Sequence, residues 1–174
     1  QDYKAIIDFI VNDTYKIIQY QLAVVVERSA NNPSQLNTLA VSGTIDTKDQ
    51  QISKSFKNWL HRTSQNLVDG AYQESTGAPK KLATVVIVHP SNLVNEIKED
   101  WAENLGQEVI VAKLYNNPKN QHEIFLILFN DNVYPEADVI NLNLIIKAYN
   151  QSLTLSLKDD PEHKRKPSSD LKTK

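Results

Sequence analysis

The sequence lacks cysteine and methionine altogether and has only four glycines among its 174 residues. Without cysteine the chain has no disulfide, no thiolate metal site, no iron–sulfur cluster and no cysteine nucleophile. The few glycines form neither a phosphate-binding loop nor a dinucleotide-binding fingerprint, and the four histidines show no metal-ligand spacing. We therefore predict a protein without a cofactor and without a metal ion.

A large excess of charge of either sign is also missing, because 19 Lys and Arg residues balance 21 Asp and Glu residues. Such a balance does not favour a nucleic acid or an anionic surface as partner. Long apolar runs are missing too: the longest, Ile17–Val26, contains Gln19 and Gln21 and falls short of the roughly 18 residues of a membrane helix. We expect no nucleic-acid partner and no membrane segment in this chain.

The chain starts at Gln1 and not at a methionine, which agrees with processing or with a position inside a longer protein. The sequence therefore leaves open a membrane tether upstream of Gln1. The absence of cysteine fits a compartment in which stray disulfides would form. Together these features favour an extracytoplasmic location, periplasmic or at the cell surface, over the cytoplasm.

The periodicity of the apolar residues predicts one α+β domain over residues 1–157, followed by a flexible charged tail over residues 158–174. The sheet is expected to be mixed or antiparallel, with about five strands and with helices mainly on one face. The predicted order α-β-β-α-β-α-β-β-α corresponds to residues 2–13, 16–28, 35–45, 47–72, 82–89, 92–104, 108–115, 122–130 and a last helix that starts at 135.

The segment Thr14–Arg28 fits two structures, a continuation of the first helix or a strand. Its run of three consecutive valines favours a strand over Lys16–Arg28. Two Asn-Asn-Pro sequences, at 31–33 and 116–118, predict turns that join neighbouring strands into hairpins. Leu82–His89 is apolar almost throughout and predicts a strand that is buried on both faces.

The residues with the clearest chemical interest follow that apolar strand. His89 ends the strand and Ser91 begins the next helix, which is where ligands sit in many α/β proteins. In a catalytic interpretation His89 is a general base, Ser91 faces it, and Glu123 joins them from a neighbouring strand end. In a structural interpretation Ser91 caps the helix and His89 lies at the edge of the core. Without a nucleophile elbow or a glycine loop, the structural interpretation is favoured.

Four residues near the N-terminus form a candidate partner surface: Tyr15, Gln19, Tyr20 and Gln21. They would be available to a partner if the strand Lys16–Arg28 lies at a sheet edge. The sequence thus favours a non-catalytic soluble interaction module that binds a protein partner and belongs to a larger protein or to an envelope or secretion-type assembly. The alternative is a small hydrolase-like enzyme with its site around His89 and Ser91.

Overall fold

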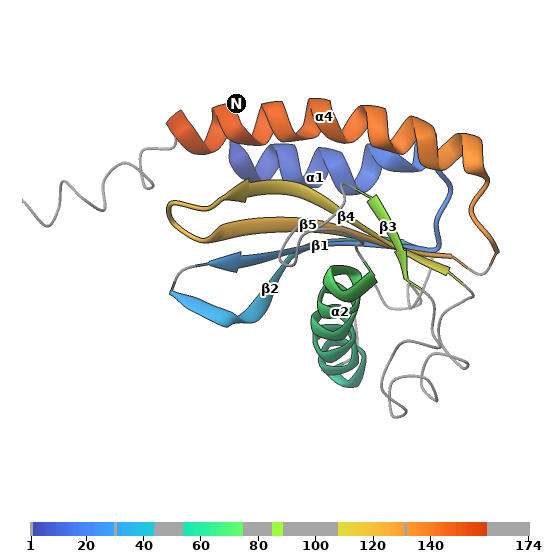
Figure 1. Ribbon diagram of the computed structural model, residues 1–174, viewed down its shortest axis with the longest axis horizontal. Helices are drawn as coiled ribbons and strands as arrows, with labels where there is room; N and C mark the ends of the chain where they lie inside the picture. Colours follow the sequence, from blue (N-terminus) through green and yellow to red (C-terminus); the bar gives the residue numbers. More distant parts are fainter. Residues whose placement is uncertain are drawn as a thin grey trace, which may run out of the picture.

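A computed structural model describes residues 2–29, 31–43, 54–74, 85–88, 108–130 and 132–159 of the chain. Within them, five strands form one antiparallel sheet in the order β2-β1-β5-β4-β3. Helices α1 and α4 pack on one face of the sheet, and α2 packs on the other (Figure 1). This arrangement confirms the predicted single-domain α+β fold, and its sheet is antiparallel throughout.

The elements follow the predicted order. The helices are α1 (Tyr3–Asp13), the short 3₁₀ helix η1 (Thr14–Lys16), α2 (Lys54–Glu74) and α4 (Glu136–Asp159). The strands are β1 (Leu22–Ser29), β2 (Asn32–Gly43), β3 (Val85–Val88), β4 (Glu108–Asn117) and β5 (His122–Asn130). The helix predicted over residues 92–104 lies outside the described residues, as does residue 160 onward in the predicted tail.

Both predicted hairpins are present. In the first, Val25 of β1 lies opposite Ala40 of β2, and in the second, Ile110 of β4 lies opposite Leu128 of β5. The same Val25 lies opposite Leu126 of β5, so pairing between β1 and β5 joins the two hairpins into one sheet. Aliphatic and β-branched side chains fill these strands because they pack well on a pleated surface that is covered on both sides.

The predicted strand Lys16–Arg28 is correct only from Leu22 onward. Before it, the helical path continues past α1, because the backbone carbonyl of Thr14 accepts hydrogen bonds from the backbone N–H groups of Ile17 and Ile18, at 2.9 and 3.0 Å. The Thr14 hydroxyl also donates to the carbonyl of Ile10 at 2.6 Å. Neither the all-helix nor the all-strand interpretation of this segment was right.

Strand β3 also differs from its prediction. It forms one end of the sheet and pairs with β4 alone among the described strands. Val86 and Val88 are buried, whereas Val85 and Ile87 are only partly buried. An apolar run thus predicted the strand correctly but overestimated its burial, since a short edge strand is covered less completely than a central one.

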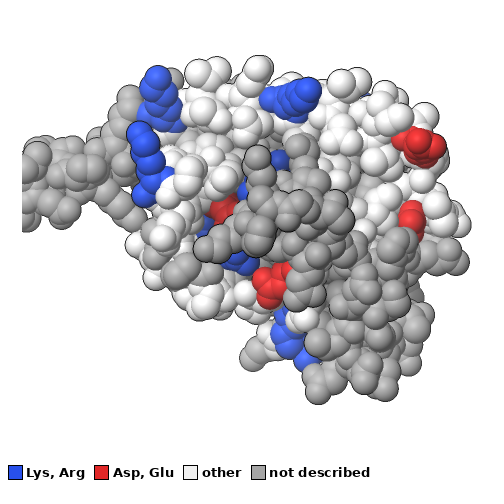
Figure 2. Space-filling view, in the orientation of Figure 1, with Lys and Arg blue, Asp and Glu red and all other residues white. Residues whose placement is uncertain are grey.

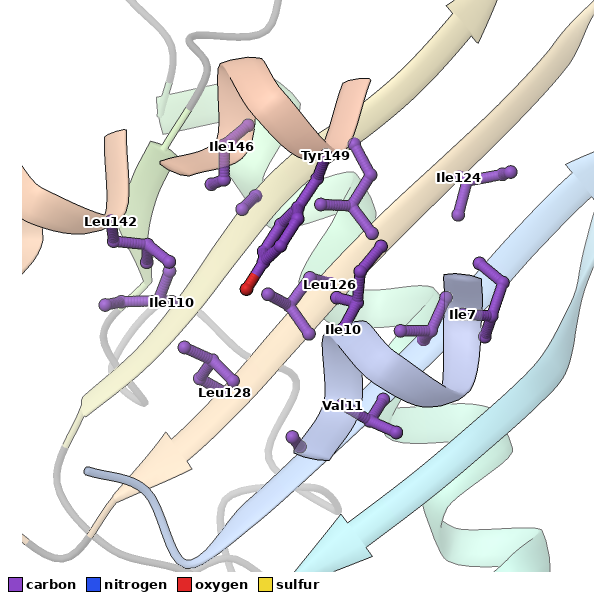
Figure 3. Packing of buried hydrophobic residues seen from close by; sticks show 14 of the residues in the cluster. Ile7, Ile10, Val11, Ile110, Ile124, Leu126, Leu128, Leu142, Ile146 and Tyr149 are labelled. Carbon is purple, nitrogen blue, oxygen red and sulfur yellow. The ribbon is translucent and has the colours of Figure 1, made fainter. Parts of the chain in front are cut away.

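The side of the sheet under α1 and α4, here named the α1/α4 face, holds a closed apolar core. Figure 3 shows Ile10 of α1 and Ile146 and Tyr149 of α4 pointing toward Leu126 and Leu128 of the sheet. All of these side chains are at most 4% exposed. Helices of this kind are amphipathic, and burial of the apolar stripe against the sheet is what fixes them in place.

Polar groups buried on the α1/α4 face have partners. The Thr14 hydroxyl lies 3.0 Å from the hydroxyl of Tyr149, and the Tyr134 hydroxyl donates to the carbonyl of Leu128 at 2.8 Å. The Glu108 carboxylate accepts the backbone N–H of Tyr134 at 2.8 Å. Burial, with the charge of Glu108 as a second cause, raises the pKa of the Tyr134 phenol far above its ordinary value. This face is therefore a satisfied structural core.

Candidate functional site

Helix α2 packs on the opposite side of the sheet, here named the α2 face. Its buried stripe contains Leu60, Leu67 and Val68, but two polar residues interrupt it. Thr63 and Ser64 lie three and four positions after Leu60, so helical geometry places them on the same side of the helix as the apolar residues. Thr63 is 0% exposed and Ser64 is 1% exposed.

These two hydroxyls are buried without partners. Neither Thr63 Oγ1 nor Ser64 Oγ has a hydrogen bond within the described part of the chain. Leaving a buried hydroxyl unpaired costs roughly 1–3 kcal/mol, and native proteins pair most such groups. Two adjacent unpaired hydroxyls therefore mark the place on the α2 face where a polar atom of a bound molecule would be stabilised.

The sheet opposite these hydroxyls is apolar. Val24, Val111, Phe125 and Ile127 come from three different strands and are fully buried on the α2 face. The Trp59 ring of α2 lies beside Phe129, with 6.3 Å between ring centroids and a tilt of 42°. Aromatic and aliphatic walls with a few polar groups are the usual lining of a small-molecule site. The α2 face has this combination, and the α1/α4 face has its polar groups already paired.

A charged group lies on the α2 face at one end of the central strands. Because side chains alternate along a strand, Arg28, Lys113 and Glu123 share this face with the apolar residues two positions away. Glu123 Oε1 lies 3.4 Å from Arg28 Nη1, and its Oε2 lies 3.7 Å from Lys113 Nζ. Arg28 Nη2 lies 3.8 Å from the carboxylate of Asp69 on α2. This group links three strands to the helix.

Within that group, Arg28 is incompletely paired. Its side chain is 18% exposed, and its Nε atom is buried without a hydrogen-bond partner among the described residues. A guanidinium has five N–H donors in a rigid fork, so one that donates through Nη1 and has only a 3.8 Å ion pair at Nη2 still has capacity to donate. Arg28 therefore adds a third unused donor to the hydroxyls of Thr63 and Ser64.

His122 does not belong to this group, although it precedes Glu123 in the sequence. It lies on the α1/α4 face, where its Nε2 is 2.9 Å from Glu27 Oε2. The Tyr3 hydroxyl donates to the same Glu27 oxygen at 3.2 Å, and the Tyr115 ring packs edge-on against the imidazole. These contacts attach the start of α1 to the sheet, which is a structural role.

No protein-family model matches the sequence, and no curated protein does either. Among solved structures, the chain is similar to the GAF domain/HD domain protein from Geobacter sulfurreducens, with 11% sequence identity, a TM-score of 0.57, and coverage of 89% of this chain and 94% of that one. It is also similar to the phycocyanobilin-bound GAF domain from a cyanobacterial phytochrome, with 9% identity, a TM-score of 0.58, and coverage of 92% and 89%. The fold is GAF-like.

This chain is also similar in fold to a transcription factor. The chain is similar to the N-acylhomoserine lactone-dependent LuxR-family transcription factor from Burkholderia cenocepacia, with 11% identity, a TM-score of 0.55, and coverage of 91% of this chain and 90% of that one. Identities this low establish the shared fold alone. Function has to be argued from the site of this chain.

The predicted catalytic residues are only partly covered by the described structure. His89 and Ser91 lie outside the described residues, so their prediction stays untested. Glu123 lies on the α2 face and pairs with Arg28 and Lys113. Of the three residues predicted to act together, the described structure of this GAF-like chain therefore contains one.

The structure does not meet the condition that was set for the predicted partner surface, whereas the partner role itself stays a prediction. Its condition was an edge position for the first strand, but β1 lies between β2 and β5. Tyr20 is buried, and its hydroxyl donates to the carbonyl of Val11. Gln21 follows it at the start of the strand, where its backbone N–H donates to a β5 carbonyl at 2.9 Å. Only Tyr15 and Gln19 are exposed, so the four residues do not form one surface at an open edge.

The described part of the chain contains no group of three His, Asp or Glu side chains arranged to hold a metal ion. Among the described helices, none has both the length and the hydropathy that a membrane span requires.

Sequence reasoning missed the polar residues of the α2 face. A signal for Thr63 and Ser64 was present, because the apolar stripe of the predicted helix is interrupted between Leu60 and Leu67. Arg28 ends one predicted strand and Lys113 lies within another, and isolated charged residues of this kind are typical of solvated side chains. What the sequence does not reveal is that Arg28 and Lys113 lie on the face of the sheet that α2 covers, since that depends on pairing between distant strands.

Proposed function

We propose that this chain is a non-catalytic binding domain that holds a small amphiphilic molecule between helix α2 and the sheet. The observation that carries the proposal is the pair of fully buried, unpaired hydroxyls of Thr63 and Ser64 in an otherwise apolar surface. A bound molecule with a hydrogen-bonding group at this position satisfies both hydroxyls, while its apolar part contacts the valines and aromatic rings of the sheet.

The names of similar structures support the same class of ligand. One is a phycocyanobilin-bound GAF domain, and another is an N-acylhomoserine lactone-dependent regulator. Both named molecules combine an apolar body with polar groups. The chain shares only its fold with these proteins, so they indicate the kind of molecule that this fold accommodates and not which molecule this chain binds.

A binding domain of this kind agrees with the interaction module predicted from the sequence. In our proposal, binding of a small molecule at the α2 face affects how the chain interacts with a protein partner. The partner, the extracytoplasmic location and the assembly context remain predictions. The hydrolase-like alternative around His89 and Ser91 also remains a hypothesis, and a serine-reactive phosphonate probe distinguishes it: labelling at Ser91 supports an enzyme.

The binding proposal is tested by calorimetric titration of the full chain with phycocyanobilin and with an N-acylhomoserine lactone. We expect saturable binding of at least one probe. Thr63→Val keeps the shape of the side chain but removes the hydroxyl, and we expect it to weaken binding about 5- to 10-fold, the equivalent of one hydrogen bond.

The matched control is Thr63→Ser, which keeps the hydroxyl and is expected to bind within about 2-fold of wild type, since only one methyl group is lost. Circular dichroism establishes that each variant is folded. Two results overturn the proposal: no saturable binding of either probe to wild type, or equal affinity of wild type and Thr63→Val.

A further inference from the structure

The charged group on the α2 face adjoins the apolar surface of the proposed binding site. Arg28 lies two positions after the buried Val26 and therefore on the same face of β1. Glu123 lies two positions before the buried Phe125 on β5, directly opposite Arg28. Figure 2 shows that blue and red side chains gather at the level of the sheet, below the layer of α1 and α4. A molecule that lies on the apolar surface therefore reaches charged side chains at one end of it.

One edge of the Arg28 guanidinium makes no hydrogen bond within the described part of the chain. Nε and Nη2 form this edge, and their N–H bonds point in the same direction. Nε is buried without a partner, and Nη2 lies 3.8 Å from Asp69 Oδ1, which is too far for a hydrogen bond. The remaining nitrogen, Nη1, donates to Glu123 at 3.4 Å. Two parallel donors at one edge match the two oxygens of a carboxylate.

Asp69, the carboxylate that faces Nη2 in the structure, is held loosely. Its side chain is 59% exposed, and a 3.8 Å contact of this kind is a weak surface ion pair. Glu123, by contrast, is 16% exposed and pairs with both Arg28 and Lys113. A carboxylate that replaces Asp69 keeps two positive and two negative charges together, because Asp69 then moves into water. A doubly charged phosphate at the same place leaves one negative charge uncompensated.

From these contacts, and resting on the proposed binding function, we infer that the ligand of the α2 face has a carboxylate at one end. This carboxylate displaces Asp69 and binds the Nε–Nη2 edge of Arg28. Asp69 follows Thr63 by six residues on α2, which is about 9 Å along the helix axis. The ligand class is therefore a small carboxylic acid with an apolar body and a second polar group, about 9 Å away, that reaches Thr63 and Ser64. Because Asp69 belongs to α2 and Arg28 to β1, the exchange also removes one link between helix and sheet.

Two matched probes test the carboxylate: ω-hydroxyoctanoate and its amide, ω-hydroxyoctanamide, which differ only at the charged end. In calorimetric titration of the full chain at about pH 7.5, where the acid is ionised, we expect wild type to bind the carboxylate about 10-fold or more tightly than the amide. Arg28→Gln removes the fork of donors and is expected to reduce this preference to about 2-fold or less. Asp69→Asn removes the competing charge and is expected to tighten binding of the carboxylate about 3-fold, with little change for the amide.

Lys119→Gln is the matched control, because it removes one positive charge from an exposed position in the turn between β4 and β5. It is expected to keep the preference of wild type. Circular dichroism melts establish that each variant is folded, and Asp69→Asn changes a mostly exposed side chain, so the test does not depend on the stability of Arg28→Gln.

The inference is overturned if Arg28→Gln keeps the full preference, if Asp69→Asn leaves the affinity for the carboxylate unchanged, or if ω-hydroxyoctyl phosphate binds more tightly than the carboxylate. Equal binding of the acid and the amide overturns the carboxylate assignment but leaves the binding function intact. The same holds if neither binds while phycocyanobilin or the N-acylhomoserine lactone does. If no probe of either set binds, the proposed function and this inference both fail.

Discussion

Both faces of the sheet bury an apolar cluster, but the polar groups buried on them differ in their hydrogen bonding. On the α1/α4 face, the Thr14 hydroxyl contacts both the carbonyl of Ile10 and the hydroxyl of Tyr149. On the α2 face, the Thr63 hydroxyl is just as inaccessible to solvent, yet no described group pairs with it. The two threonines have the same chemistry and the same burial, so what differs is whether the described structure supplies a hydrogen-bond partner.

In our proposal, that difference separates a structural core from a binding surface. The α1/α4 face holds Tyr20, Tyr134 and Tyr149, and burial raises the pKa of all three phenols, most strongly for Tyr134. Each of these hydroxyls has a partner. Buried hydroxyls that have partners within the described residues are stable as they stand, whereas unused donors and acceptors would gain from a bound ligand.

The largest expected effect comes from removing the two threonine hydroxyls in turn. Thr14→Val breaks two hydrogen bonds and leaves the buried Tyr149 hydroxyl without its partner, so we expect the free energy of unfolding to fall by about 1–3 kcal/mol. Thr63→Val removes an unpaired hydroxyl and keeps the side-chain shape, so we expect stability to be unchanged or to rise by up to about 1 kcal/mol. Urea unfolding curves of the ligand-free chain measure both.

If Thr63→Val lowers the free energy of unfolding as much as Thr14→Val does, the Thr63 hydroxyl is paired in solution. The contrast between the two faces is then lost. Comparing the urea dependence of both variants with that of wild type guards against a change in the unfolded state, because the slope reports the surface exposed on unfolding.

The next largest effect is a change of stability with pH, which tests the burial of Tyr134 on the α1/α4 face. Below pH 10 the Tyr134 phenol is protonated in both states, so its contribution to stability is constant there. Above pH 10 the unfolded chain loses this proton while the folded chain keeps it, and the free energy of unfolding falls by about 1.4 kcal/mol per pH unit. Tyr134→Phe is expected to remove that part of the slope between pH 10 and 11. Equal slopes for wild type and Tyr134→Phe would contradict the pairing and burial of this phenol.

The parts of the fold that local patterns determine were predictable. Alternating apolar residues around the Asn-Asn-Pro turns were enough to predict both hairpins. The path after α1 was not predictable, because the 3₁₀ turn at Thr14 is held partly by Tyr149, which lies 135 positions away in the sequence. The strand order was not predictable for the same reason. Val25 pairs with Leu126, which is far away in the sequence, and no local pattern encodes that contact.

The candidate site was less predictable than the fold. The interruption of the α2 stripe at Thr63 and Ser64 is visible in the sequence, but an interrupted stripe is equally typical of hydroxyls that bond back to the helix. Glu123 was predicted to join His89 and Ser91, which lie outside the described residues, and within the described part it pairs with Arg28 and Lys113 on the α2 face. Whether a buried hydroxyl has a hydrogen-bond partner depends on its neighbours in three dimensions. The structure is therefore needed to tell a hydroxyl that bonds back to its helix from one that is unpaired.

The smallest effect tests how tightly the α2 face is packed. Gly70 is buried in α2, and a Cβ added there would lie 3.7 Å from Val88 Cγ1 of β3, an ordinary van der Waals contact. Because alanine favours a helix more than glycine does, Gly70→Ala is expected to raise the free energy of unfolding by about 0.5–1 kcal/mol. Gly43→Ala is the control of opposite sign, since its Cβ would collide with the Gln21 carbonyl and lie 2.8 Å from Leu22 Cα. A loss of stability in Gly70→Ala, measured by urea unfolding, means that α2 has no room to spare against β3, and the α2 face is then as closed as the α1/α4 face.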